Sequence, residues 1–454
     1  MRHAAGGSID FSRGSIVRDI ILFSLPIVAG ELLQNLYNSV DALVVGNLVG
    51  DGALAAVTVS GTVSNMIVNF FNGMSVGANV VVSRAFGEGD RAALNRRVQA
   101  AFTFSALLGV VLSVLGILFT PQLLDFAGTQ SDYYADALVY LRIYLAGLMF
   151  TVIYNNGAGI LRAVGDSGTP FRILTLTCVL NIVLDLVLVA VIPLGVAGVG
   201  LATVISQAVS VALIYRAINR AQGVRCFDLA ELRRSGRQTV FDVLRVGMAA
   251  GMQSALIGFS NLFVVRYMNL FDTASVAGIG IAQRLDKFII LPAKSFGITM
   301  TTFVSQNIGA GRYDRLAEGK KKCLLVAVGT TLALSAVVYL FADDCVALFN
   351  PNPGVVTVGV SMMKVLLPFF CIMAVREIYL GILRGSGKNA VPMVLSLVGM
   401  VGVRQAFLAV TMRGTPQIEY IYFCYPIAWF ATVSLLLIYY LLVRGELRQK
   451  YRGL

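Results

Sequence analysis

The chain has 454 residues, of which 57% are hydrophobic and only 13% are charged, against roughly 25% charged residues in a soluble domain. Its formal net charge of +12 would suit a nucleic-acid binder, but the basic residues sit in short connectors between apolar stretches. Composition and charge distribution therefore exclude an ordinary soluble protein and favour a membrane protein with many spans.

Apolar stretches of about 20 residues or longer predict membrane-spanning helices. Of the 36 Lys and Arg residues, 26 fall on the side that holds both termini, and only Arg266 and Arg413 fall on the opposite side. This bias predicts cytoplasmic termini. The twelve spans are expected near residues 18–45, 54–83, 98–120, 135–161, 171–192, 196–219, 240–268, 275–306, 322–342, 358–384, 391–412 and 419–443.

Two sequence motifs recur at one fixed separation. ILRAVGDSGTP begins at Ile160 and its copy ILRGSGKNAVP at Ile382, while VSRAFGEGD begins at Val82 and its copy VSQNIGAGR at Val304, so the two pairs have the same spacing. Each copy holds six predicted spans, an even number, so the two copies have the same orientation in the membrane. Parallel repeats of this kind are typical of secondary transporters.

The predicted fold is therefore all-α, with twelve transmembrane helices in two pseudo-symmetric six-helix lobes. We expect a first lobe at residues 1–219, a basic cytoplasmic linker at 220–238, and a second lobe with a cytoplasmic tail at 239–454.

The carboxylates of Asp41 and Asp185 lie within predicted spans of the first lobe, as does that of Glu31. Asp41 is in span 1 and Asp185 in span 5, four residues after Asn181, and neither has a Lys or Arg within one helical turn. Charge in lipid is costly and usually marks function. Two close carboxylates disfavour joint ionisation, which suits a proton carrier. Alternatively, Na⁺ would sit among the oxygens of Asp41, Asn181, Asp185 and Thr203.

Other polar residues repeat at helical spacing within the spans, and they either bind helices together or line a cavity for substrate. In the second lobe the charged residues form either a structural network or a cationic half-cavity that attracts anionic or zwitterionic groups. The cavity candidates are Glu31, Gln34, Asn38, Asn65, Asn69, Asn155, Gln207, Gln253, Lys287, Lys294 and Glu377.

Span 1 contains FSLPIVAGELLQNLYNSVDALVVG, and with the V-S-x-x-x-G-x-G and ILR-x-x-G motifs it resembles the multidrug and toxic compound extrusion (MATE) family. The resemblance implies an antiporter that expels organic compounds in exchange for H⁺ or Na⁺. It places a cation site at Asp41, Asn181, Asp185 and Thr203, and it makes Pro26 the hinge of a bending first helix. Glu31 and the basic span 8 depart from the family pattern.

We therefore expect a monomeric secondary antiporter of the bacterial inner membrane that works by alternating access on small organic molecules. The alternatives are a flippase for an anionic lipid-linked precursor and a membrane-embedded enzyme. A single histidine and the lack of a C-x-x-C pair predict no transition-metal site. No cofactor or ATP is expected, because nucleotide-loop and catalytic motifs are missing. No nucleic-acid partner is expected, because the basic residues lie in connectors between spans.

Overall fold

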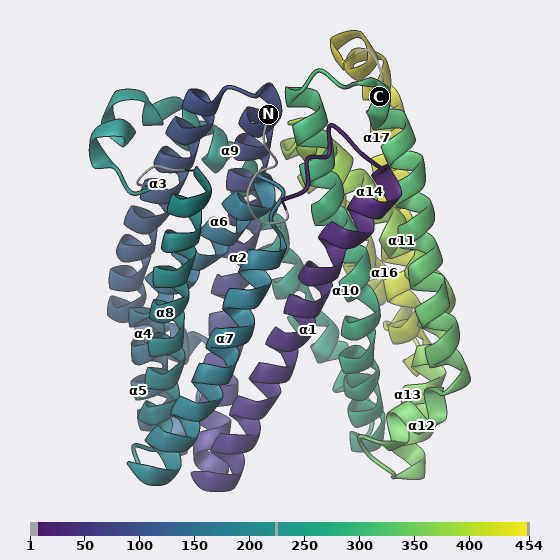
Figure 1. The fold of residues 1–454 in the computed structure, drawn as a ribbon. Coiled ribbons are helices and arrows are strands. Elements are labelled where there is room, and N and C mark those ends of the chain that lie inside the picture. The colour runs from purple at the N-terminus through teal and green to yellow at the C-terminus, as the bar shows by residue number, and fades with distance from the viewer. Residues whose placement is uncertain (1–7, 223–225, 452–454) are drawn as a thin grey trace. The chain divides into compact units, whose positions relative to one another are not determined.

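The computed structural model describes residues 8–222 and 226–451, and within these ranges it contains helices and no strand. The helices of the first half carry the first six spans (Figure 1). They are α1 (Ile16–Leu48), α2 (Asp51–Glu88), α3 (Arg91–Leu118), α4 (Thr120–Phe126), α5 (Ser131–Ala146), α6 (Leu148–Ala163), α7 (Gly168–Asp185), the π-helix η1 (Leu186–Val191) and α8 (Val196–Gln222).

The second half repeats this order of long helices. Its elements are α9 (Leu229–Met268), α10 (Thr273–Gly309), α11 (Asp314–Leu340), α12 (Ala342–Ala347), α13 (Pro353–Leu366), the 3-10 helix η2 (Leu367–Phe369), α14 (Phe370–Gly385), α15 (Ala390–Leu397), the π-helix η3 (Val398–Val403), α16 (Arg404–Thr411) and α17 (Ile418–Tyr451).

The predicted all-helical membrane fold is confirmed. Within the described ranges, ten helices are long and apolar enough to cross a membrane, and α5 with α6, bent by 43°, makes an eleventh span. Helix α1 has 33 residues and completes the twelve. The chain is therefore a multi-span membrane protein with six spans in each half.

By internal contacts the chain forms two compact units. Unit 1 comprises residues 1–10 and 29–251, and unit 2 comprises residues 11–28 and 252–454. Helix α1 runs without interruption through Pro26, yet its residues up to Val28 pack with unit 2 and those from Ala29 pack with unit 1. The lobe boundaries expected from the sequence stay a prediction.

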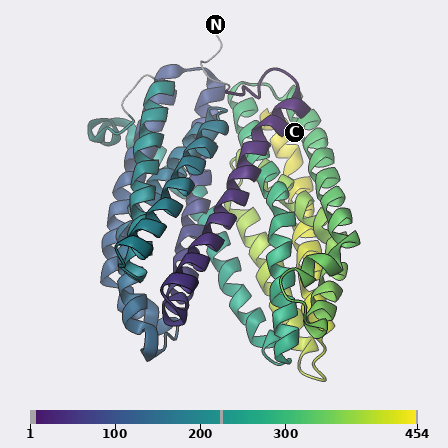
Figure 2. The same cartoon turned by 60° about the horizontal axis from the view of Figure 1, so that its bottom comes forward.

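In unit 1, close approach of helices depends on small residues. A Cβ atom on Gly77 of α2 would lie 2.9 Å from the backbone nitrogen of Gly247 in α9. A Cβ on Gly73 would likewise collide with the backbone at Gly251. Glycine at such positions lets two helices in lipid pack backbone to backbone. The long helices of the unit run side by side in Figure 2.

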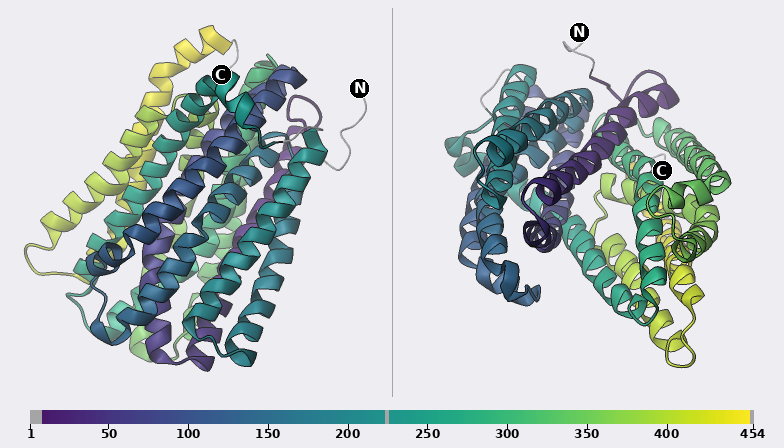
Figure 3. Two further views of the ribbon diagram at one scale, coloured as in Figure 1. Left: turned by 90° about the vertical axis from the view of Figure 1, so that its left-hand side faces the viewer. Right: turned by 90° about the horizontal axis from the view of Figure 1, so that it is seen from below.

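Unit 2 has a core of aromatic and sulfur-containing side chains, in which the ring centroids of Phe370 and Trp429 lie 5.2 Å apart. Its long helices, green to yellow in Figure 3, also run side by side. The amino-terminal segment belongs to this unit. Phe11 is fully buried, and its backbone N–H donates to Gln306 at 3.0 Å. The ring of Phe11 packs edge-on against Phe23 and Phe303.

The repeated motifs form matching turns in the two halves. Gly89 and Gly311 have φ of 74° and 67°, while Gly165 and Gly387 have φ of 87° and 86°. Glycine is the residue that adopts positive φ at low cost, which explains why it recurs here. Asp90 ends the VSRAFGEGD motif and caps α3, because its carboxylate accepts from the backbone N–H groups of Ala92 and Ala93. These hydrogen bonds hold the pKa of the Asp90 carboxyl below its usual value.

Candidate functional site: a buried pair of carboxyl groups

Asp41 and Asp185 meet inside unit 1. Asp41 comes from α1 and is 8% exposed, and Asp185 is the last residue of α7 and is fully buried. Their carboxyl groups lie within hydrogen-bonding reach of each other. The π-helix η1 begins directly after Asp185. Two helices that are distant in sequence thus bring two acids together at one point in the membrane.

The side-chain amide of Asn181 lies between the two acids. With its nitrogen facing the carboxyl groups, it donates to Asp41 Oδ1 and to Asp185 Oδ2, each at 3.2 Å. In the same orientation its oxygen accepts from the backbone N–H of Thr203 at 3.2 Å. The orientation follows from the hydrogen-bond network, because the opposite one would set oxygen against oxygen. Asn181 therefore links α1, α7 and α8.

Thr203 and Tyr37 close the cluster. The Thr203 hydroxyl donates to the carbonyl of Val199 at 3.1 Å and shares a hydrogen bond of 3.3 Å with the Tyr37 hydroxyl. Tyr37 was not among the residues predicted for this site, although it lies four residues before Asp41 in α1. Residues four apart share a helix face, so this spacing was the signal that could have found it.

The charge of the cluster is not balanced by a basic side chain. Among the residues that the structure describes, neither Asp41 nor Asp185 forms an ion pair, and the Oδ1 atom of Asp185 has no hydrogen-bond partner. An uncompensated carboxylate in lipid costs several kcal/mol. A cluster with this composition can lower that cost chemically by taking up a proton or a small cation.

Among the described residues, no hydrogen bond joins the other polar candidates of unit 1 to this cluster. Gln34, Asn65 and Asn69 are exposed, and Glu31 and Asn155 are half-buried. The Oε1 atom of Gln207 is buried without a partner in the described part. The side chain of Asn38 lies outside the described residues.

In unit 2 the candidates divide into two groups. Gln253 accepts from Arg384 at 2.9 Å, and Glu377 forms an ion pair with the neighbouring Arg376. Lys287 and Lys294 are exposed on α10. The first group therefore takes part in a side-chain network, whereas the two lysines present cationic surface.

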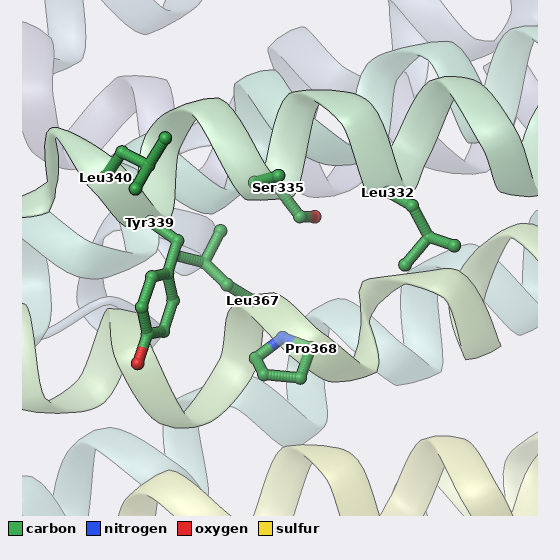
Figure 4. Close-up of a pocket in the computed structure, with 7 residues that line it drawn as sticks. Leu332, Ser335, Tyr339, Leu340, Leu367 and Pro368 are labelled. Carbon is green, nitrogen blue, oxygen red and sulfur yellow. The ribbon is translucent and has the colours of Figure 1, made fainter.

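A separate hollow in unit 2 is apolar. It has a volume of about 340 Å³ and lies between α11 and the segment at η2 (Figure 4). Its lining has no charged side chain, so it offers no chemistry for an ion. The lining residues are Leu332, Ser335, Ala336, Tyr339, Leu340, Leu367 and Pro368.

Comparison with known proteins yields one family. The family model described as MatE matches the chain twice, at residues 26–187 and at residues 249–410. The two matches are equally long, and their separation along the chain agrees to within one position with that of the repeated motifs. The family model therefore recognises each half of the internal repeat as one copy.

Two relatives and one solved structure illustrate the similarity. The probable multidrug resistance proteins YpnP and YoeA of Bacillus subtilis are 27% and 28% identical. The YpnP match covers 88% of this chain and 89% of the relative, and the YoeA match covers 94% of each. A multidrug resistance MATE family transporter of the MOP superfamily, solved in an outward-facing conformation, superposes with a TM-score of 0.88 at 22% identity, over 99% of both chains.

Proposed function

We propose that this chain, which belongs to the MatE family, is a secondary antiporter that exports organic compounds in exchange for a cation by alternating access. The names of the Bacillus relatives support drug-like cargo, and the parallel internal repeat supports alternating access. The predicted bacterial inner membrane, cytoplasmic termini and monomeric state belong to the same proposal.

The buried pair of carboxyl groups carries this proposal. Asp41 and Asp185 lie together in unit 1 without a basic partner among the described residues. A cation that binds there and leaves on the other side of the membrane transfers charge, and the membrane potential drives this by about 2.3 kcal/mol per 100 mV. Such a site links the transport of an organic molecule to the ion gradient.

The closeness of the two carboxyl groups favours a proton as the coupling ion. Asp41 and Asp185 lie within hydrogen-bonding reach of each other. One proton shared between them removes the repulsion of two negative charges without any further ligand.

The organic cargo would contact polar surface of the spans outside the carboxyl pair. In α2, Asn65 and Asn69 are exposed, as are Gln34 in α1 and the two lysines of α10. An exposed amide or charged side chain in a span is costly if it faces lipid. We therefore expect these side chains to face water or the cargo. We include the remaining candidates in the same proposal, namely Glu31, Asn38, Asn155, Gln207, Gln253 and Glu377.

The test is efflux of a cationic dye from vesicles that contain the purified chain, with pH and Na⁺ gradients imposed separately. We expect a pH gradient alone to drive wild-type efflux. Asp41→Asn and Asp185→Asn each remove one titratable group, so we expect at least a tenfold loss of pH-driven efflux in both.

Asp136→Asn is the matched control, because Asp136 is exposed on α5 of the same unit and undergoes the same chemical change. It should retain wild-type efflux. Coupled efflux that survives in both cluster variants would remove the ion-site assignment, and efflux driven by Na⁺ but not by pH would overturn the choice of proton.

A further inference from the structure

A buried guanidinium lies in unit 2 without a carboxylate partner. Arg404 is the first residue of α16 and is only 2% exposed. It donates from Nη2 to Ser260 Oγ at 2.7 Å, and its guanidinium carbon lies 5.7 Å from the ring centroid of Tyr425. Its Nε atom has no partner in the described part of the chain.

Among the described residues, no acid forms an ion pair with Arg404. The ion pair of Glu377 is with Arg376. A guanidinium stays protonated at any physiological pH, so it cannot lower the cost of burial by losing its proton. A permanent cation in a membrane span then calls for an anion from outside the chain.

Hydrogen-bond donors remain free beside Arg404. Ser260 Oγ accepts from Arg404 and also from Gln405 Nε2, the latter at 2.9 Å. With two donors on its oxygen, the Ser260 hydroxyl keeps its own proton for a further acceptor. Gln405 Nε2 also donates to the Ser260 carbonyl at 2.9 Å, so both of its protons are already in use. The donors left for a ligand are the N–H groups of Arg404 and the Ser260 hydroxyl proton, and they suit an anion.

The internal repeat places this cluster at the counterpart of the carboxyl site. Ser260 comes from the first span of its half, Arg404 from the fifth and Tyr425 from the sixth. In unit 1, Asp41, Asn181 and Thr203 come likewise from the first, fifth and sixth spans.

The two family matches support the same correspondence. Counted from the start of each match, Arg404 stands in the second half where Asn181 stands in the first, and counted from the repeated motifs it stands one position further on. The same three spans therefore build an acidic cluster in one half and a cationic one in the other.

We propose that Arg404 and Ser260, the latter held in place by Gln405, form a binding site for a small monovalent anion, either a free halide or the carboxylate of a transported compound. Both have a single negative charge and accept hydrogen bonds from convergent donors. This site is additional to the proposed cation coupling, and its test measures binding without transport.

Trp429 provides an internal reporter. It is the single tryptophan of the chain, and its ring centroid lies 6.3 Å from that of Tyr425, which in turn contacts Arg404. The experiment titrates chloride, and separately acetate, against gluconate at constant ionic strength in the purified full chain. Tryptophan emission and the thermal unfolding midpoint are recorded at each concentration.

We expect a saturable response to chloride, to acetate or to both in the wild type, and none in Arg404→Gln. Ser260→Ala keeps the guanidinium but removes one donor, so the apparent dissociation constant should rise about tenfold. Arg413→Gln makes the same charge change at an exposed residue beyond α16 and should bind like the wild type.

A response to chloride alone identifies a free halide, and a response to acetate alone identifies a carboxylate. If Arg404→Gln does not fold, Ser260→Ala decides the matter, since unchanged affinity there contradicts the proposed donor set. A wild type without a saturable response to either anion overturns the proposal and leaves Arg404 as a brace between helices.

Discussion

Asn181 organises the carboxyl cluster through a single amide. In the orientation that satisfies the hydrogen-bond network, its nitrogen donates to Asp41 and Asp185, and its oxygen accepts from the backbone N–H of Thr203. An amide is suited to this position because it offers donors and an acceptor without adding charge. The arrangement steadies two acids in lipid while leaving them free to exchange a proton.

We predict that Asn181→Ala lowers the free energy of unfolding by about 1–3 kcal/mol, because buried polar groups lose their partners. The loss should be larger at pH 8 than at pH 5. Ionised carboxylates need the amide donors, and protonated ones need them less. Thermal unfolding in detergent at the two pH values measures this difference.

Asn156→Ala is the control for that experiment. Asn156 is also buried in unit 1, but its amide donates to the carbonyl of Val152, at 3.0 Å in its own helix. Its replacement should cost stability equally at both pH values. The same pH dependence in both variants would show that the effect does not come from the carboxyl pair.

At the scale of helices, the fifth span of each half departs from α-helical geometry beside a buried charge. The π-helix η1 follows Asp185 directly, and η3 ends immediately before Arg404. π-helical turns often occur at functional sites. In each half, the fifth span thus changes its helical pitch next to a buried charged side chain.

The segment before α1 is fixed to unit 2 by its own contacts. Arg315 donates to the backbone carbonyls of Phe11, Arg13 and Gly14, each at 3.1 Å, and Asn307 also donates to Phe11. These bonds hold the start of α1 against α10 and α11. They explain why the first part of α1 packs with unit 2 although the sequence places it in the first lobe.

We predict that Phe11→Ala lowers the free energy of unfolding by about 3–5 kcal/mol, because a fully buried aromatic ring leaves a cavity. Phe126→Ala is the matched control, since Phe126 is 80% exposed in the described structure. It should change stability by no more than about 0.5 kcal/mol. Equal unfolding midpoints for the two variants in detergent would show that the segment is not anchored through Phe11.

For the molecule as a whole, the distribution of basic residues predicts its orientation. On the side that holds both termini, the connectors and the adjoining ends of the spans carry 26 of the 36 Lys and Arg residues. Both termini should therefore lie in the cytoplasm. A fluorescent protein that folds only in the cytoplasm should therefore fluoresce when fused after Leu454. A phosphatase that is active only outside should work when inserted at Asn350, between α12 and α13. The reverse pattern would refute this orientation.

The sequence by itself determined the class of protein, the twelve spans and the repeat, because hydropathy and motif spacing are properties of the chain. It also singled out Asp41 and Asp185, since charge within an apolar stretch is visible without coordinates.

The tertiary structure decided which helices are neighbours. Helical periodicity fixes the face on which a residue lies but not the helix that this face meets. Only packing could place the amide of Asn181 between two acids, or set Ser260 against Arg404, 144 residues apart in sequence. Packing likewise decided that α1 is shared between the two units.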